Sequence, residues 1–483
     1  MLKANAEAPA ASLDTTGTNN RWPPQIKFIV GNEACERFSY YGIKGILALY
    51  IINVLVKTQD DATSIIALFS AGNYFMPMLG AWVSDRYWGR YRTILWISLV
   101  YCLGNAVLAT SDLFQSPDAK TWALYAGLAL IAFGSGGIKP CVSAFMGDQF
   151  KPEQRHLLQK AYAAFYWSIN LGSFFSFLII PAVRKSWGYG WAFGVPGFFM
   201  AFATFVFWMG TRHYVMVPPS RVTKSAGFFR VFFEALRNRD NRRPGQSFWD
   251  TAITRFGQKD VDAARSVGPI LSIFAVIPVF WALFDQTFST WVIQGQKMTV
   301  FKIGEWTIGP EEMLSANPLF VMLLIPVMTL GLYPLVGRLA TPLRRIGAGM
   351  FLAGVSYIVV ASLQARIDGG AQLSILWQCV PYVILTIAEV LVSTTGLEFA
   401  FREAAPEMKS IIMGFWSLTV AAGNLLVWFI TRALAGASGS SHSTSVSASR
   451  FMLYAALIFV VTIVFTVIAA RYRYRDAAAA QGR

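Results

Sequence analysis

The chain has 483 residues, of which 55% are hydrophobic and only 14% charged, and its mean hydropathy is +0.47. Soluble domains carry about a quarter charged residues, so the composition excludes an ordinary soluble protein and predicts an all-α integral membrane protein. A formal net charge of +15 is compatible with binding to nucleic acid, but the basic residues lie in short loops between apolar runs. We therefore expect a lipid bilayer as partner, and no nucleic acid.

The first 26 residues are polar and rich in Ala, Asn and Thr, which predicts an N-terminal tail without a cleavable signal peptide. The four cysteines lie in apolar segments and form no CxxC pair. We therefore expect no disulfide, no metal site and no cofactor.

Charged and phenolic side chains recur in the first apolar stretch, at Glu33, Glu36, Arg37, Tyr40, Tyr41 and Lys44. A charge at mid-bilayer costs about 2.5–3.5 kcal/mol, so these groups must face a wet or paired interior. At about 100° per residue, Glu33, Arg37, Tyr40 and Lys44 share one helical face. This face indicates a proton path and a grip on a charged solute.

Apolar runs long enough to cross a bilayer occur in two sets of about six. They begin near Lys27, Ala62, Thr93, Thr121, Lys160 and Trp191, and again near Gly268, Asn317, Gly347, Ser374, Ser410 and Phe451. We predict two six-helix bundles, 27–210 and 268–471, joined by a basic linker at 211–267 and followed by a tail at 472–483. The Gly- and Ser-rich stretch 436–449 is expected to be a flexible outer loop.

Basic residues mark one set of loops as cytoplasmic under the positive-inside rule. This set contains the 86–92 turn, the linker and the C-terminal tail, so both termini are predicted on the cytoplasmic side of the cell (inner) membrane. Arg184 and Lys185 fall on the opposite side and are exceptions.

The linker contains one amphipathic pattern. Phe229, Phe232, Phe233 and Leu236 share a helical face opposite a polar face with Arg230, Glu234 and Arg237. The pattern predicts a helix on the inner membrane surface; a basic spacer with no further role is the alternative.

Four motifs carry a family resemblance. The 80–92 turn, Gly80-Ala-Trp-Val-Ser-Asp85-Arg86-Tyr-Trp-Gly89-Arg90-Tyr-Arg92, resembles the loop signature of the major facilitator superfamily. Glu33-x-x-Glu36-Arg37-Phe38-x-Tyr40-Tyr41-Gly42 resembles the helix 1 hallmark of the proton-dependent oligopeptide transporter (POT) family. The stretch 134–140, which contains Lys139, resembles the helix 4 signature of this family. The stretch 165–172, which contains Asn170, resembles its helix 5 signature.

The resemblance implies a major facilitator fold with 12 transmembrane helices in two six-helix bundles. It implies a transporter, not an enzyme, that imports di- and tripeptides with protons by alternating access, with no oligomer required. Three residues match family positions that hold peptide: Asn170, Asn317 and Ser393. Three others resemble aromatic residues that line the family's pocket: Tyr74, Trp281 and Trp416. Glu389 matches an acid that pairs with the helix 4 lysine region or gates the cavity.

Several of these residues can be weighed without the resemblance. Lys139 lies within a Gly-rich run before Pro140, which predicts a broken helix opening on a cavity. There Lys139 would neutralise Glu33 or Glu36, or meet a substrate carboxylate; snorkelling to an interface is the alternative. Asn317 would hold substrate or merely cap a helix.

Lys44 and Asp285 are charges of opposite sign in predicted helices 1 and 7, in different halves. Family members usually have Arg and Glu there, so this chain keeps the charges but loses the bidentate fork of Arg. The two residues are predicted to form an outer gate and to compete for the ends of a zwitterionic peptide.

The three histidines, His156, His213 and His442, all lie in predicted loops. Some family members use a helix 2 histidine for the proton, which this chain cannot do. Glu33 and Glu36 are therefore the predicted proton carriers, with a proton affinity set by the distances to Arg37 and Lys139.

Two other functions stay open at this point. Relatives in the same family carry other anionic or peptidomimetic solutes, and a receptor could use the same pocket. An intramembrane enzyme would need a nucleophile or metal motif, and the predicted spans contain no GxSGx or HExxH.

Overall fold

The computed structural model describes residues 21–219, 227–332, 335, 341–438, 445–472 and 474. The predicted tails therefore lie largely outside the described residues, as do 220–226 of the linker and 439–444 of the outer loop.

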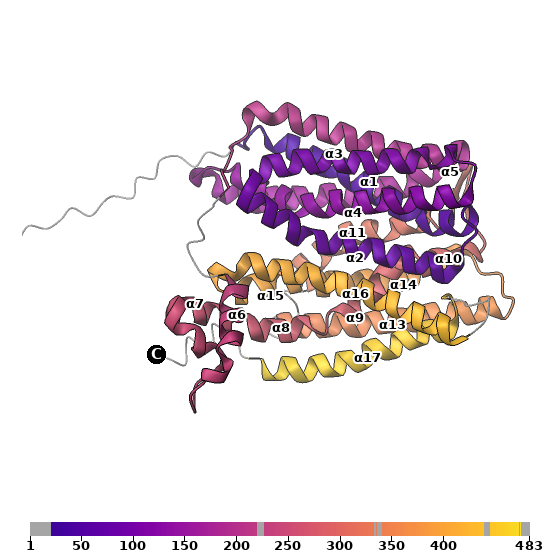
Figure 1. The fold of residues 1–483 in the computed structure, drawn as a ribbon. Helices are drawn as coiled ribbons and strands as arrows, with labels where there is room; N and C mark the ends of the chain where they lie inside the picture. The colour runs from indigo at the N-terminus through magenta and orange to yellow at the C-terminus, as the bar shows by residue number, and fades with distance from the viewer. Residues whose placement is uncertain are drawn as a thin grey trace, which may run out of the picture.

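Long helices run side by side in two groups (Figure 1). The first group contains α1 (Ile26–Asn53), α2 (Gln59–Val83), α3 (Gly89–Ala109), α4 (Pro117–Asp148) and α5 (Leu158–Met209). The second contains α8 (Val267–Phe274), α9 (Pro278–Phe284), α10 (Thr290–Gln296), α11 (Ala316–Pro326), α13 (Pro342–Asp368), α14 (Cys379–Glu389), α15 (Thr395–Glu403), α16 (Lys409–Ser438) and α17 (Ala448–Arg471).

The described residues contain eight helical stretches that are long and apolar enough to cross a membrane, or nine with one bent pair. Two stretches, Gln59–Leu113 and Leu158–His213, have 55 and 56 residues, over twice what a bilayer needs. A π-helical turn divides the first stretch at Ser84–Trp88, and Gly188, at φ 85°, kinks the second. Nine stretches, counting the bent pair as one, become eleven crossings when these two long stretches are each counted as two. The charged helix α1 is the twelfth, which agrees with the number predicted.

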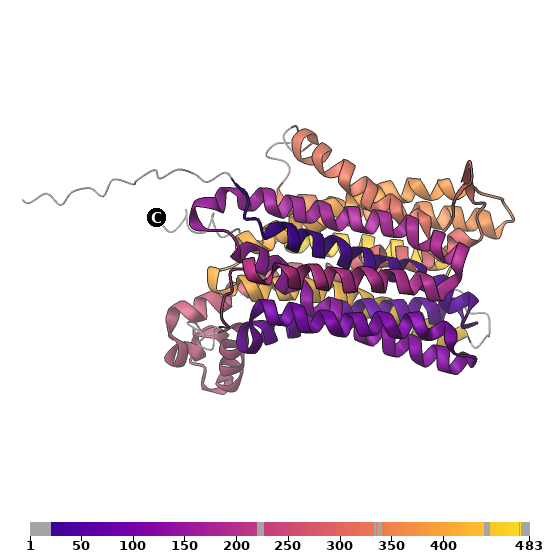
Figure 2. The same cartoon turned by 90° about the horizontal axis from the view of Figure 1, so that it is seen from above.

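Two small helices, α6 (Phe228–Arg237) and α7 (Ile253–Arg265), lie in the described part of the linker. Figures 1 and 2 place them at one end of the bundle, beside the ends of α8 and α15. At the other end, β1 (Phe301–Ile303) and β2 (Trp306–Ile308) form an antiparallel hairpin in which Phe301 pairs with Ile308.

The prediction of a broken helix 4 is wrong. The α-helix of α4 is continuous from Pro117 to Asp148 and passes through Pro140. Its glycines serve close packing instead: Gly136 faces the backbone of Asn73 in α2, and Gly134 faces the backbone of Tyr101 in α3. Lys139 is therefore carried by an intact helix that its neighbours approach closely.

The two groups of helices meet along two seams. α2 packs against α16, and α5 packs against α11. Charged side chains that pair across the contacts between the halves are therefore candidates for a gate.

We predict that Gly80→Ala destabilises the protein because α2 and α4 touch there. A Cβ at Gly80 would lie 2.1 Å from the carbonyl oxygen of Gly137, and overpacking of this kind costs about 1–3 kcal/mol. Gly31→Ala in α1 is the matched control, because a Cβ there meets nothing within 4 Å. Thermal unfolding in detergent should show a lower midpoint for Gly80→Ala only; equal midpoints would refute the close contact.

Candidate substrate site and gate

A buried charge cluster lies on α1, as predicted. Arg37 Nε lies 3.2 Å from Glu33 Oε1, and the Arg37 guanidinium also pairs with Glu36. The hydroxyl of Ser135, on α4, donates a hydrogen bond of 2.8 Å to Glu36 Oε1. The two acids thus share one arginine at the contact between α1 and α4.

Lys139 faces the same cluster from α4. Its Nζ lies 4.1 Å from the ring centroid of Tyr74 and 4.9 Å from that of Tyr40, an arrangement in which the rings attract the cation. Among the described residues this ammonium has no hydrogen-bond acceptor, although it is buried. In this conformation it pairs with neither Glu33 nor Glu36, and it has donors to offer a ligand.

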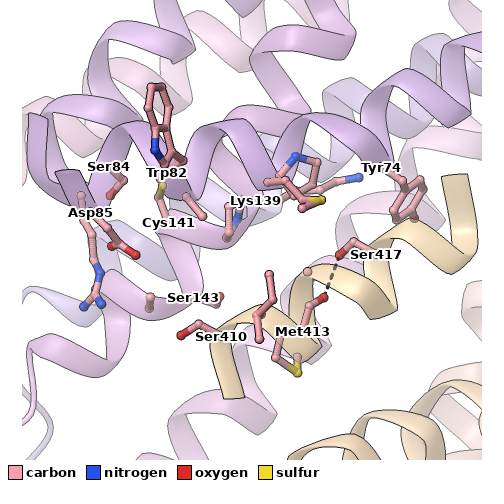
Figure 3. A pocket seen from close by; sticks show the side chains of 18 residues that line it. Tyr74, Trp82, Ser84, Asp85, Lys139, Cys141, Ser143, Ser410, Met413 and Ser417 are labelled. Carbon is pink, nitrogen blue, oxygen red and sulfur yellow. Dashed lines mark hydrogen bonds between the residues drawn. The ribbon is translucent and has the colours of Figure 1, made fainter. Parts of the chain in front are cut away.

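Lys139 lines a cavity of about 570 Å³ between α2, α4 and α16. Figure 3 shows Tyr74 and Lys139 on one side and Ser417 of α16 on the other. The cavity continues to Asp85 and Arg90 in the turn after α2, on the predicted cytoplasmic side. It therefore runs from Lys139 to that end of the bundle.

Lys44 and Asp285 form the predicted contact between the halves. Lys44 Nζ lies 2.9 Å from Asp285 Oδ1, and the exposed fractions of the side chains are 2% and 7%. Asn424 of α16 donates a hydrogen bond to the other oxygen of Asp285. Lys44 Nζ also lies 3.9 Å from the ring centroid of Phe288, whose ring stacks on Tyr41.

Further ion pairs, which sequence reasoning missed, also join the halves. Arg184 contacts Glu311 at 2.7 Å, and Lys185 contacts Glu312. These bases were the two exceptions to the positive-inside rule, and that anomaly was the available signal. Together with Lys44 and Asp285 they close the predicted outer side, whereas the cavity reaches the opposite end.

Other predicted residues form a second polar group in the C-terminal half. The Asn317 side chain donates hydrogen bonds to Glu389 Oε2 at 2.7 Å and to Thr386 at 3.2 Å. It therefore bridges α11 to α14, and the helix-cap alternative is wrong, since the residue at the cap is Ser315. Glu389 contacts Asn317 and makes no hydrogen bond or ion pair with Lys139 in the described part of the chain.

The remaining predicted residues line the interior without a charged partner. The Asn170 amide donates to the Tyr166 carbonyl of its own helix. Trp281 and Trp416 lie edge to face with centroids 6.2 Å apart, and the Trp281 indole N–H is buried without an acceptor among the described residues. Ser393 is half-buried in a π-helical segment, Val390–Thr394.

Residues 91–446 match the family model described as POT family. The chain belongs to the POT family. It is 37% identical over 371 residues to "Solute carrier family 15 member 2" of Danio rerio, covering 73% of this chain and 50% of the relative. It is also 37% identical over 363 residues to "Peptide transporter family 1" of Drosophila melanogaster, covering 72% and 49%. The chain thus spans about half the length of the curated relatives it matches.

Solved POT structures confirm the fold predicted. The crystal structure of an auto-inhibited POT family peptide transporter matches with a TM-score of 0.84 at 38% identity, covering 93% of this chain and 98% of that one. The POT family transporter PepTSo matches with the same TM-score and identity, covering 94% and 99%. The chain has the two-bundle major facilitator fold, and its relatives are transporters, not enzymes.

We predict that Lys44→Ala and Asp285→Ala each abolish transport, because either change leaves one buried charge unpaired. The swap Lys44→Asp with Asp285→Lys should restore closure of the outer side, though not necessarily substrate binding. Cysteines at 44 and 285, in a background lacking the native cysteines, should cross-link when the outer side is closed. An absence of cross-linking in every condition would rule out the direct contact.

Closure of the outer side is expected to depend on Glu311. Burial raises the pKa of Glu311 to about 7, against an opposing effect of the Arg184 charge, from an ordinary value of 4.5. The closed state then binds a proton that a solvated Glu311 releases, so lowering the pH from 8 to 6 should favour closure.

Spin-label distances between positions 113 and 377 measure this closure. In the wild type, the distance between the two labels should shift toward the shorter, closed-state value at pH 6. In Glu311→Gln it should stay at this shorter value at both pH 8 and pH 6. Glu305→Gln is the matched control, since Glu305 is an exposed acid on the same outer segment. A wild-type shift that survives in Glu311→Gln, or one toward the longer distance in acid, would contradict the assignment.

Proposed function

We propose that the protein is a proton-coupled symporter that imports di- and tripeptides by alternating access. The observation that carries this proposal is the pairing of buried charges across the two halves, with Lys139 left facing the cavity. A gate built from ion pairs opens when a charged solute replaces one partner. The relatives include proteins named as peptide transporters, which favours a peptide as that solute.

Peptide would be held at its two charged ends. Its carboxylate would meet Lys139 and Lys44, and its ammonium would meet Asp285 or the group of Glu389, Asn317 and Asn170. Tyr74, Trp281, Trp416 and Ser393 would surround its side chains. An extended chain covers at most about 3.3–3.6 Å per residue, so a clamp at both ends limits the length of the substrate.

Charge balance gives a reason for proton coupling. Glu33, Glu36, Arg37 and Lys139 contribute two negative and two positive charges to one buried cluster. A peptide carboxylate at Lys139 adds a negative charge there, and a proton on Glu33 or Glu36 restores neutrality. Because uncompensated charge is costly away from water, the carboxylate and the proton would bind together.

The proposed setting is the cell membrane, with both termini in the cytoplasm and 27–210 and 268–471 as the moving bundles. In that orientation the closed side faces outward and the cavity at Lys139 opens inward. One proton entering down a potential of 100 mV supplies about 2.3 kcal/mol, before any pH gradient.

The test is uptake of labelled dialanine into proteoliposomes under an imposed inward pH gradient. We expect accumulation that a protonophore abolishes and unlabelled di- and tripeptides inhibit. Glu36→Gln should lose accumulation but retain exchange at equal peptide concentrations, since exchange needs no net proton movement.

Glu33→Gln and the double variant complete this test, and Glu153→Gln, an exposed acid, is the control that should accumulate normally. Accumulation that persists in both single variants and in the double would refute the proton assignment. Acid-driven uptake of another anion that peptides fail to inhibit would instead support the alternative solute class.

A further inference from the structure

The linker helix α6 has three distinct faces. Phe228, Val231 and Ala235 are buried. Phe229, Phe233 and Leu236 are 41%, 60% and 40% exposed, and at about 100° per residue they form an adjacent apolar arc. Arg230 and Arg237, both exposed, border the far edge of this arc. The exposed apolar surface thus lies between a docked face and a basic edge.

The buried face fixes α6 to the bundle. The ring of Phe228 lies 5.6 Å, centroid to centroid, from the ring of Phe415 in α16. The ring of Phe229, at the border between the buried face and the exposed arc, lies 5.9 Å from the same ring and stays 41% exposed. Lys259 of α7 contacts Glu407, before α16, at 3.2 Å. Figure 2 places both helices at the margin of one end of the bundle, not across its centre. The helix is thus held beside the membrane-embedded part.

The charges of the linker are not balanced at its surface. Four of its five acids have partners within the linker: Glu234 pairs with Arg255, Asp250 and Asp262 with Arg265, and Asp240 with Arg239. Arg237, Arg242 and Arg243 are exposed and form no ion pair with another described residue. The free charge next to the apolar arc is therefore positive.

We propose that this surface, Phe229, Phe233 and Leu236 with Arg237, Arg242 and Arg243, binds anionic phospholipid of the adjacent leaflet. Aromatic and aliphatic side chains that flank arginines suit the boundary between acyl chains and headgroups. The planar guanidinium pairs well with phosphate, and clustered arginines beside a membrane favour anionic headgroups. The amphipathic pattern predicted this position, and the docking on α16 now fixes which face is free.

The test uses the full chain in nanodiscs, with an NBD fluorophore on a cysteine replacing Phe233 or, separately, Leu236. Cys35, Cys102 and Cys379 are changed to Ala, and the buried Cys141 is kept. The control carries the fluorophore at Thr254, an exposed position in α7. The membrane quencher is a phosphatidylcholine spin-labelled near the headgroup.

In discs containing phosphatidylglycerol, quenching at 233 and 236 should exceed quenching at 254 at least threefold. It should fall by half or more in pure phosphatidylcholine, and also when Arg237, Arg242 and Arg243 are changed to Gln. Equal quenching at 233, 236 and 254 would overturn the proposal. Protection of the fluorophore only in nanodiscs that hold two copies of the protein would also overturn it, because the surface would then bind a second chain and not lipid. Strong quenching that ignores both headgroup and arginines would also overturn it, because apolar contact alone would then suffice.

Discussion

The burial of charge inside the bundle constrains the rest of this structure. Lys44 and Asp285 are almost inaccessible and belong to different halves, so neither half alone can neutralise its own charge. Separating them in an apolar interior costs far more than the pair contributes to stability. If the pair acts as the proposed gate, opening the outer side requires water or a charged ligand to take the place of each partner. A zwitterion with suitably spaced ends meets that requirement with a single molecule.

The same constraint explains why the site has two parts. Around Lys139 the partners are aromatic rings, which hold a cation without using its hydrogen-bond donors. Around Glu389 the partner is the amide of Asn317, which contacts the acid without neutralising it. Under the proposed function, Lys139 would thus offer its N–H donors to a peptide carboxylate and Glu389 would offer an acceptor to a peptide ammonium, with no ion pair to break at either residue.

The sequence predicts much of this arrangement, and the failures have physical causes. The helical period placed Glu33, Arg37 and Lys44 on one face because local geometry depends on neighbouring residues only. The pair of Arg184 and Glu311 joins residues 127 positions apart, and no local pattern reports such a contact. The expected break near Pro140 failed because a transmembrane helix can lose one hydrogen bond and continue where its neighbours pack closely.

α16 connects the parts of the molecule that a transport cycle must coordinate. Its Ser417 lines the cavity, its Asn424 holds Asp285, and its Arg432 contacts Asp61 of α2 at 3.0 Å. Phe415, on the same helix, receives the linker. Because a helix moves as a stiff body over a few turns, displacement at one of these contacts is felt at the others. The linker therefore rests, through Phe415, on the helix that forms one wall of the cavity.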